Sequence, residues 1–205
     1  MSAAAAFRLQ KVAEAEFPTR WGSFRIFGFA GFYPDRVEEA VVLKMGDMTS
    51  DEPPLVRIHS ECLTGDVFHS LRCDCRAQLE LSLTRIADEG RGLLIYEHQE
   101  GRGIGLLNKL RAYELQDQGA DTVEANQRLG FEVDMRSYGL PGAILGYFGL
   151  KKIRLLSNNP DKVQAVERAG VEVVERVPCL VDPVDSTQAY LQTKKDKMGH
   201  LIDGL

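Results

Sequence analysis

The chain has 205 residues, which is enough for one sizeable hydrophobic core without disulfides or metals to hold it together, so we expect a single domain. Apolar residues make up 44% and charged residues 27%, a balance that excludes a disordered or fibrous protein. The formal net charge of −5 argues against a general nucleic-acid binder, because such proteins owe most of their affinity to the neutralisation of phosphates.

No stretch of the sequence approaches the roughly 18 apolar residues of a membrane span, and the N-terminus lacks the basic start and apolar run of a secretory signal. We therefore expect a cytoplasmic protein with no membrane or nucleic-acid partner.

In a reducing compartment, the four cysteines are more often metal ligands, reactive thiols or buried residues than disulfides. We expect residues 1–8 to form a flexible tail and residues 9–205 to form the folded domain.

Three strands are predicted in the first part of the chain. Alternating apolar residues predict strands at 24–29 and 40–45, and a short apolar run predicts a third at 55–58. The third strand leads directly into His59-Ser60-Glu61-Cys62. Cys62 is therefore expected at or just past the end of a strand.

The pattern then changes to that of a helix. Apolar residues follow Gln78 at Leu79, Leu83 and Ile86, a spacing typical of an amphipathic helix, and Gly90 is suited to end it.

The middle of the chain contains a candidate phosphate-binding segment. A strand is expected at 93–96 and a helix at 106–118, with the glycine-rich loop 101–105 between them. Backbone N–H groups at the start of a helix attract anions. Basic residues also outnumber acidic ones between Arg91 and Arg111, although the whole chain is acidic.

The last third of the chain again alternates between helices and strands. Asn159 is suited to cap a helix that has Pro160 at its first position and ends near Gly170. The remaining elements are a helix at 143–148, strands at 153–156 and 171–177, and a final helix after Ser186. These elements favour an α/β (mixed α+β) fold, a single compact domain in which a mixed β-sheet and flanking helices surround a cleft.

Three cysteines gather within fourteen positions, as Cys62-x10-Cys73-x-Cys75. On an extended backbone, residues two apart point to the same side about 7 Å apart at Cα, so both thiolates of the close pair can reach one ion. Residues two apart diverge on a helix, so segment 72–75 is expected to be extended or turned and to precede the helix near Gln78. Three thiolate ligands leave the fourth coordination position of a zinc ion open, which is the pattern of catalytic zinc sites. We expect this zinc ion to lie in the cleft.

Other interpretations of the cluster stay open on spacing alone. They are buried unpaired thiols and a closed structural zinc site with His59 or His69 as the fourth ligand. His59-Ser60-Glu61 also reads H-x-E, as in zinc deaminases, but no P-C-x-x-C follows. Cys179, far along the chain, is expected to be an ordinary buried thiol.

Several residues outside the cluster are candidates for chemistry. If the backbone is extended, Asp134 and Arg136 present a carboxylate and a guanidinium on one face, although such a pair is more often a surface ion pair. Tyr113 fits either the core or a site, and its helical spacing favours the core. Segment 158–162 fits either an anion site at a helix start or a simple helix cap.

Four longer motifs are far more specific than these single residues. They read Arg57-Ile-His-Ser-Glu-Cys-Leu-Thr-Gly-Asp66, Ser70-Leu-Arg-Cys-Asp-Cys75, His98-Gln-Glu-Gly-Arg-Gly-Ile-Gly-Leu-Leu-Asn-Lys109 and Gln116-Asp-Gln-Gly-Ala-Asp-Thr-Val-Glu-Ala-Asn126. With them the chain closely resembles GTP cyclohydrolase II, from about Leu9 to about His200. The resemblance implies a riboflavin-pathway enzyme that hydrolyses GTP at C8 of guanine, releases formate and diphosphate, and leaves 2,5-diamino-6-(5-phospho-ribosylamino)pyrimidin-4(3H)-one.

The resemblance also implies roles for individual residues. The three clustered cysteines match the family's zinc ligands, Asp134 and Arg136 match its proton acceptor and nucleophile, and Tyr113 matches a catalytic-site tyrosine. One catalytic Zn²⁺ per subunit, Mg²⁺ with the triphosphate and a homodimer are implied as well. The implied GTP contacts are Arg57, Ile58, His59, Ser60, Glu61, Gln78, Glu100, Gly101, Arg102, Thr122, Ser157 and Lys162.

One implied role conflicts with elementary chemistry. Arginine is effectively always protonated, so a nucleophilic Arg136 demands unusual activation, and phosphate clamping is the interpretation we prefer. Because little chain precedes the zinc motif, we expect a monofunctional enzyme. Two rival hypotheses are a closed-zinc binding module and a related purine-nucleotide hydrolase that stops at the ring-opened formamide.

Overall fold

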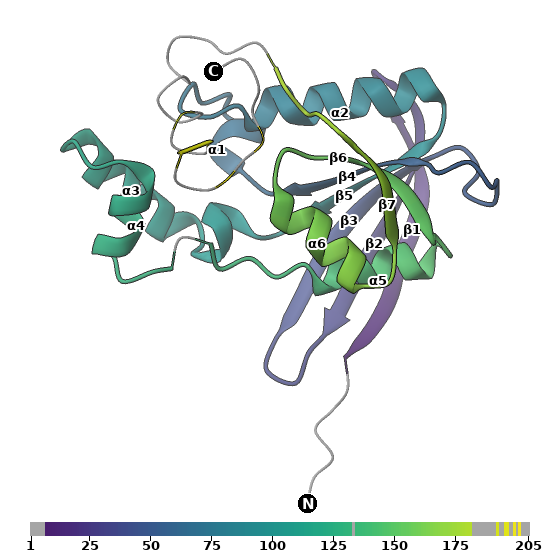
Figure 1. Ribbon diagram of the computed structural model, residues 1–205, viewed down its shortest axis with the longest axis horizontal. Coiled ribbons are helices and arrows are strands. Elements are labelled where there is room, and N and C mark those ends of the chain that lie inside the picture. Colours follow the sequence, from purple (N-terminus) through teal and green to yellow (C-terminus); the bar gives the residue numbers. More distant parts are fainter. Residues whose placement is uncertain are drawn as a thin grey trace, which may run out of the picture.

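The computed structural model describes residues 7–132, 134–181, 192, 195–196, 199 and 201 (Figure 1). The strands are β1 Arg8–Thr19, β2 Gly22–Phe32, β3 Val37–Met45, β4 Leu55–Ser60, β5 Gly92–Glu97, β6 Lys152–Leu156 and β7 Glu172–Val177. The helices are α1 Leu63–Asp66, α2 Cys75–Glu89, α3 Leu106–Asp117, α4 Thr122–Arg128, α5 Gly139–Tyr147 and α6 Pro160–Arg168, with a 3₁₀ turn, η1, at Glu100–Gly103. None of the helices in this part of the chain has the length and apolar character needed to cross a bilayer.

The strands form one mixed sheet in the order β1-β2-β3-β5-β4-β6-β7. The pairs from β1 to β5 along this order are antiparallel, whereas β5, β4, β6 and β7 pair in parallel. The carboxyl ends of parallel strands meet at one edge, which is where ligands bind in open α/β sheets. The sheet therefore delivers the residues that follow β4, β5 and β6 to a common place, and the predicted mixed α/β domain is confirmed.

Helices cover both faces of this sheet (Figure 1). On one face Phe29 of β2 belongs to the same core as Ile144 of α5, and on the other face Phe24 packs in a core with Ile86 of α2. The alternation of side chains along a strand sends these two phenylalanines to opposite faces. A strand that is covered on both sides reads as a continuous apolar run, as residues 93–95 of β5 do.

Helices α3 and α4 lie to one side of the sheet (Figure 1). They pack through a small apolar cluster that contains Ala112, Ala120 and Ala125. Asp121 caps α4 in a capping box, in which its carboxylate accepts the N–H of Glu124 at 3.0 Å and the Glu124 side chain accepts the N–H of Asp121. This helix pair forms one wall of the pocket described below.

Most of the predicted elements are confirmed, and further ones emerge, among them the short helix α1 and the turn η1. The predicted strands correspond to β2 to β7, and Asn159 caps α6, as its side-chain oxygen accepts the N–H of Asp161 at 2.9 Å. Strand β1 and helix α4 have no counterpart in the prediction. Because β1 is an edge strand exposed along nearly its whole length, the alternation in its sequence is weak: it rests mainly on the small residues Ala13 and Ala15 and is broken by Lys11. Arg8, placed in the predicted tail, is its first residue.

The start of α2 corrects the prediction near the cysteines. This helix begins at Cys75 and not near Gln78, and Asp74 before it is turned, with φ −98° and ψ 9°. The close cysteine pair is therefore turned and not extended.

Helix α5 likewise begins at Gly139, earlier than predicted, because Pro141 is tolerated in the first turn of a helix. The predicted tail residues 1–6 and most of the region of the predicted final helix after Ser186 lie outside the described residues.

Two glycines one helical turn apart on α5 give a test of its packing. A Cβ added at Gly142 would lie 2.5 Å from Cβ of Ala169, whereas a Cβ at Gly146 would meet no atom within 4 Å. We expect Gly142→Ala to lower the free energy of unfolding by about 1–3 kcal/mol through overpacking. Gly146→Ala should raise it by up to about 1 kcal/mol through helix propensity. Urea unfolding measures both values, and effects of equal sign would contradict the close approach of α5 to Ala169.

Candidate functional site

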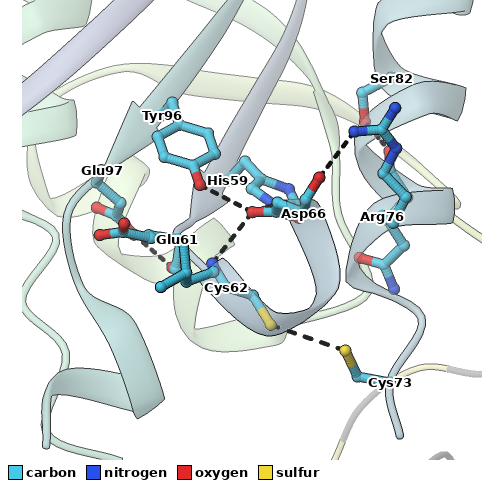
Figure 2. Close-up of polar contacts among 12 residues, drawn as sticks. His59, Glu61, Cys62, Asp66, Cys73, Arg76, Ser82, Tyr96 and Glu97 are labelled. Atoms are coloured by element: carbon cyan, nitrogen blue, oxygen red, sulfur yellow. Dashed lines mark hydrogen bonds and ion pairs between the residues drawn. The ribbon is translucent and has the colours of Figure 1, made fainter. Parts of the chain in front are cut away.

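The three clustered cysteines meet beyond the carboxyl end of β4. Cys62 lies between β4 and α1, Cys73 lies in the loop after α1, and Cys75 is the first residue of α2. Their sulfur atoms all lie within 4.8 Å of one another, and the Sγ atoms of Cys62 and Cys73 are 3.7 Å apart (Figure 2). The spacing in the sequence thus does bring the three thiols to one point.

The separation of the sulfurs suits a single tetrahedral metal ion. Two sulfurs bound at about 2.3 Å to a tetrahedral zinc lie about 3.8 Å apart, close to the distance between Cys62 and Cys73. No histidine or carboxylate joins the group within the described residues. His59, considered above as a fourth ligand, directs its Nε2 to Asp66 at 3.1 Å instead. The donor set therefore fits a zinc ion with three protein ligands and one open position.

The three thiols alter one another's pKa. Hydrogen bonds with Cys73 and Cys75, together with the charge of Lys109, lower the pKa of Cys62. The same contact with Cys62 raises the pKa of Cys73 to about 11 and raises that of Cys75. Cys62 is thus the first of the three to become a thiolate, the form that binds a metal.

A buried carboxylate orients the residues around Cys62 (Figure 2). Asp66 accepts the backbone N–H of Cys62 at 3.1 Å and the hydroxyl of Tyr96 at 2.9 Å, besides its pair with His59. The rings of His59 and Tyr96 stack with centroids 5.4 Å apart. Burial lowers the pKa of His59, so its ring is neutral near pH 7. The single ring N–H then lies on Nε2 and donates a hydrogen bond to the Asp66 carboxylate.

One pocket extends from the cysteines across the carboxyl ends of β4, β5 and β6. All but two of the predicted site residues line it, and they come from segments far apart in the sequence. The predicted residues found there are Arg57, His59, Ser60, Glu61, Cys62, Cys73, Cys75, Gln78, Glu100, Gly101, Arg102, Tyr113, Thr122, Arg136, Ser157 and Lys162.

The two exceptions, Ile58 and Asp134, contact lining residues. The side chain of Ile58 is buried in the sheet core, and its carbonyl oxygen accepts from Nζ of Lys162 at 2.8 Å. Asp134 accepts from Nε of Arg136 at 2.9 Å and from its backbone N–H at 3.0 Å. Burial would raise the pKa of Asp134, but the hydrogen bonds and charge of Arg136 lower it overall. The pair is a partly buried ion pair at the edge of the pocket.

Cationic side chains outnumber acidic ones in the pocket. The lining cations are Arg57, Arg72, Arg102, Lys109, Arg136 and Lys162, against the two acidic residues Glu61 and Glu100. The hydroxyl of Ser60 donates to Glu97 at 2.6 Å and accepts from Lys162 at 3.2 Å and from Arg136 at 3.4 Å. Two cations therefore converge on one oxygen, and the pocket suits an anionic ligand.

The glycine-rich loop holds part of this cationic surface in a strained conformation. Arg102 has φ 63°, a left-handed value that is uncommon for residues other than glycine. At Gly103 a Cβ would meet the backbone of Met135 at 3.0 Å, and the N–H of Met135 donates to the carbonyl of Arg102 at 3.0 Å. This close approach keeps the loop beside Asp134 and Arg136.

Some buried polar atoms of the lining residues have no partner within the described part of the chain. They are Nε of Arg57, Nδ1 of His59, Nη1 of Arg102 and Nδ2 of Asn159. Buried polar groups in native proteins are nearly always hydrogen bonded. Unpaired atoms around one pocket indicate a polar ligand that would supply the missing partners.

Comparison with known proteins agrees with this arrangement. Residues 10–178 match the family model described as GTP cyclohydrolase II. The chain belongs to this family. It is 53% identical over 195 residues to GTP cyclohydrolase-2 of Histophilus somni (strain 2336). The match covers 95% of this chain and 89% of that protein. GTP cyclohydrolase-2 of Yersinia pseudotuberculosis is 54% identical, at 95% and 98% coverage. Riboflavin biosynthesis protein RibBA of Aquifex aeolicus is 54% identical over 95% of this chain and 48% of its own length.

The predicted membership of the GTP cyclohydrolase II family is therefore confirmed.

Several polar residues around the pocket were not among the predicted site residues. Asp66 and Lys109 are the last residues of two motifs quoted above, so the sequence did contain a signal for them. The sequence contained no such signal for Glu97, which is the last residue of an apolar strand and is buried in the structure. Thr64, whose hydroxyl lies 3.2 Å from that of Tyr113, belongs to the same quoted motif as Asp66.

Gly65 gives a test of the shared metal site. A Cβ at this position in α1 would lie 2.8 Å from Sγ of Cys73 and 3.1 Å from Sγ of Cys62. We expect Gly65→Ala to lower the affinity for Zn²⁺ by about 10- to 100-fold, because the methyl group pushes the sulfurs apart. Competition with a chromophoric chelator measures the affinity, and Gly146→Ala is the control. Equal zinc affinities of the two variants would contradict a site shared by these thiols.

Proposed function

We propose that the protein hydrolyses GTP at C8 of guanine with the help of Zn²⁺ and releases formate and diphosphate. The product is 2,5-diamino-6-(5-phospho-ribosylamino)pyrimidin-4(3H)-one, and the reaction is the first step of riboflavin biosynthesis. One observation carries the proposal: a single pocket combines three thiols suited to one metal ion with an excess of cationic side chains. Membership of the GTP cyclohydrolase II family supports the same reaction.

The metal would be held by Cys62, Cys73 and Cys75. When bound, Zn²⁺ supplies a Lewis acid and an activated water at neutral pH. Asp66 orients this centre without joining it, because its carboxylate fixes the backbone at Cys62 and the ring of His59 at the same time. A ligating residue that is held in this way keeps its geometry when substrate binds.

The cationic side of the pocket would bind the triphosphate. We assign this role to Arg102, Arg136 and Lys162, and Mg²⁺, when bound with the triphosphate, would offset part of its negative charge. Burial would lower the pKa of Arg136, but its hydrogen bonds to Asp134 raise it above the ordinary value. A guanidinium that holds its proton so firmly is a poor nucleophile. We therefore assign to Arg136 the clamping of phosphate.

Proton transfer is assigned to Asp134 and Tyr113. While Arg136 contacts Asp134, the carboxylate is weakly basic, so a turn of the guanidinium towards phosphate would raise the proton affinity of Asp134. Substrate binding would thereby activate the base. Burial raises the pKa of Tyr113, so its hydroxyl stays protonated and can donate a hydrogen bond to the reacting atoms.

Glu100 has a more restricted role than direct recognition through its carboxylate. That carboxylate already accepts the N–H groups of Leu63 at 2.7 Å and Gly101 at 2.8 Å, and the ammonium of Lys109 at 2.7 Å. It therefore organises the glycine-rich loop, and a contact with GTP would come from the backbone. The other residues assigned to nucleotide binding are Arg57, Ile58 through its carbonyl, His59, Ser60, Glu61, Gln78, Gly101, Thr122 and Ser157.

The proposal includes a homodimer that acts in the cytoplasm, as the family resemblance implies. Large exposed apolar side chains support an interface: Phe68 is 70% exposed and Leu71 67%, both between Cys62 and Cys73 in the sequence, and Leu107 of α3 is 72% exposed.

The reaction is tested by incubating the purified protein with GTP, Zn²⁺ and Mg²⁺ and measuring formate and diphosphate together. We expect equal amounts of the two, and no formate from Cys73→Ser, because that variant removes a metal ligand. Diphosphate without formate would indicate a hydrolase that stops at the ring-opened formamide. Neither product would indicate a binding module.

Lys162 gives a pH dependence for substrate binding. Burial lowers the pKa of its ammonium to about 7, so the free protein holds Lys162 mostly neutral at about pH 8. A triphosphate favours the charged form and raises this pKa, so binding should take up close to one proton at that pH. Below about pH 6 the lysine is already charged and the uptake disappears. Calorimetry of GTP binding without metal, in two buffers of different ionisation enthalpy, measures the number of protons.

Matched variants separate this proton from those of the nucleotide. Lys162→Met should lose the uptake, whereas Lys151→Met, at an exposed position, should retain it. Identical proton uptake by the wild type and Lys162→Met would contradict the proposed contact with phosphate.

A further inference from the structure

A buried ammonium group lies against the first of the three cysteines. Lys109 extends from α3, and its Nζ lies 3.1 Å from Sγ of Cys62 and 2.7 Å from Oε1 of Glu100. The side chains of Lys109 and Glu100 are only 13% and 10% exposed. The contact is therefore a shielded, charge-assisted hydrogen bond, which is stronger than the same contact in water.

Glu100 holds Lys109 in this position. Besides the ammonium, its carboxylate accepts the backbone N–H groups of Leu63 and Gly101. Leu63 directly follows Cys62, so the carboxylate is fixed to the same turn of the chain that carries the cysteine. The ammonium is thus aimed at the sulfur by an anchor that moves with it.

The partners of Lys109 distinguish it from a phosphate-binding lysine. Lys162 contacts only neutral oxygens, those of Ile58 and Ser60, among its hydrogen-bond partners in the described chain, so its charge is available to an anion. Lys109 instead lies between a carboxylate and a sulfur that carries negative charge as a metal ligand. Its charge is already compensated within the protein.

A cation in this place has a definite effect on a metal centre. Three thiolates exceed the charge of a divalent ion by one negative charge, which the ammonium of Lys109 offsets in part, because it also pairs with Glu100. A hydrogen bond to a ligating sulfur also withdraws electron density from it, so the metal becomes a stronger Lewis acid. In addition, an incoming triphosphate would meet less negative charge beside the metal than three thiolates alone would present.

We propose that Lys109, aimed by Glu100, is a positioning residue that donates a hydrogen bond to the Cys62 thiolate and thereby lowers the negative charge on that ligand and activates the three-cysteine metal centre. This inference rests on the proposed zinc site. It assigns to the chain a residue that acts on the metal through its ligand, with no contact to the nucleotide.

The absorption of the cobalt-substituted protein tests this role without relying on turnover. Loss of the hydrogen bond raises the energy of the sulfur electrons, so the sulfur-to-cobalt charge-transfer band of Lys109→Met should move to longer wavelength. Lys109→Arg keeps a charged donor and should return the band towards its wild-type position. Lys109→Gln, with a neutral donor, should give an intermediate shift and decides the question if the methionine variant does not fold.

Kinetics of the zinc enzyme give the second measurement. We expect Lys109→Met to lower kcat by about 10- to 100-fold, with KM for GTP changed less than about threefold, since the metal is affected and the nucleotide contacts are not. Arg111→Met is the matched control on the same helix. Arg111 is exposed and donates to Asn108, so both the band and kcat should stay unchanged in this variant.

The outcomes separate this inference from the proposed function. An unshifted band in the methionine and glutamine variants, or a raised KM with unchanged kcat, would overturn the role of Lys109, and the latter would make it a phosphate contact. A wild-type protein that binds no cobalt would overturn both proposals. If the wild type binds cobalt but makes no formate, the proposed reaction fails, and the band shift still decides the role of Lys109.

Discussion

The parallel pairing of β4 with β5 ends at Ser60 and Glu97, whose side chains are joined by a hydrogen bond of 2.6 Å. Beyond this point the first strand continues to Cys62 and the second to the glycine-rich loop, so the register of this pair places the thiols beside the loop. Strand β6 pairs on the other side of β4 and brings Lys162 to the same edge through α6. A change of register by one residue would turn every one of these side chains to the opposite face.

Buried carboxylates arrange the charges that this register brings together. Asp66 lies beneath Cys62, Glu97 beneath Ser60, and Glu100 beneath the glycine-rich loop. Each accepts hydrogen bonds from at least two groups, as a buried anion requires. An acidic protein thus presents a cationic pocket, because cations outnumber acids along its lining and the buried acids already accept hydrogen bonds from the protein.

The sequence allowed the central elements and most of the pocket to be predicted, and the reasons for the failures are physical. Buried strands such as β5 have an apolar pattern, whereas the edge strand β1 buries too little to show a strong one. The start of α2 was placed too late because Cys75 carries no helix signal of its own. Motif resemblance found the lining residues, and the spacing of Asp134 and Arg136 already indicated their ion pair. Neither could show that the side chain of Ile58 faces the core, because that depends on which way a side chain points.

The thin packing of α3 and α4 has a consequence for how the pocket opens. This pair packs through three buried alanines and the partly buried Leu115 and Leu129, while the sheet is flanked by larger cores that contain phenylalanine, leucine and isoleucine. The free energy of a local opening scales with the apolar contact that it breaks, so this wall can swing away while the sheet stays folded. The pocket residues that α3 and α4 carry, Tyr113 and Thr122 among them, would then leave and rejoin the pocket together. Lys109 also belongs to α3, so the same movement would take its ammonium away from Cys62 and return it when the wall closes.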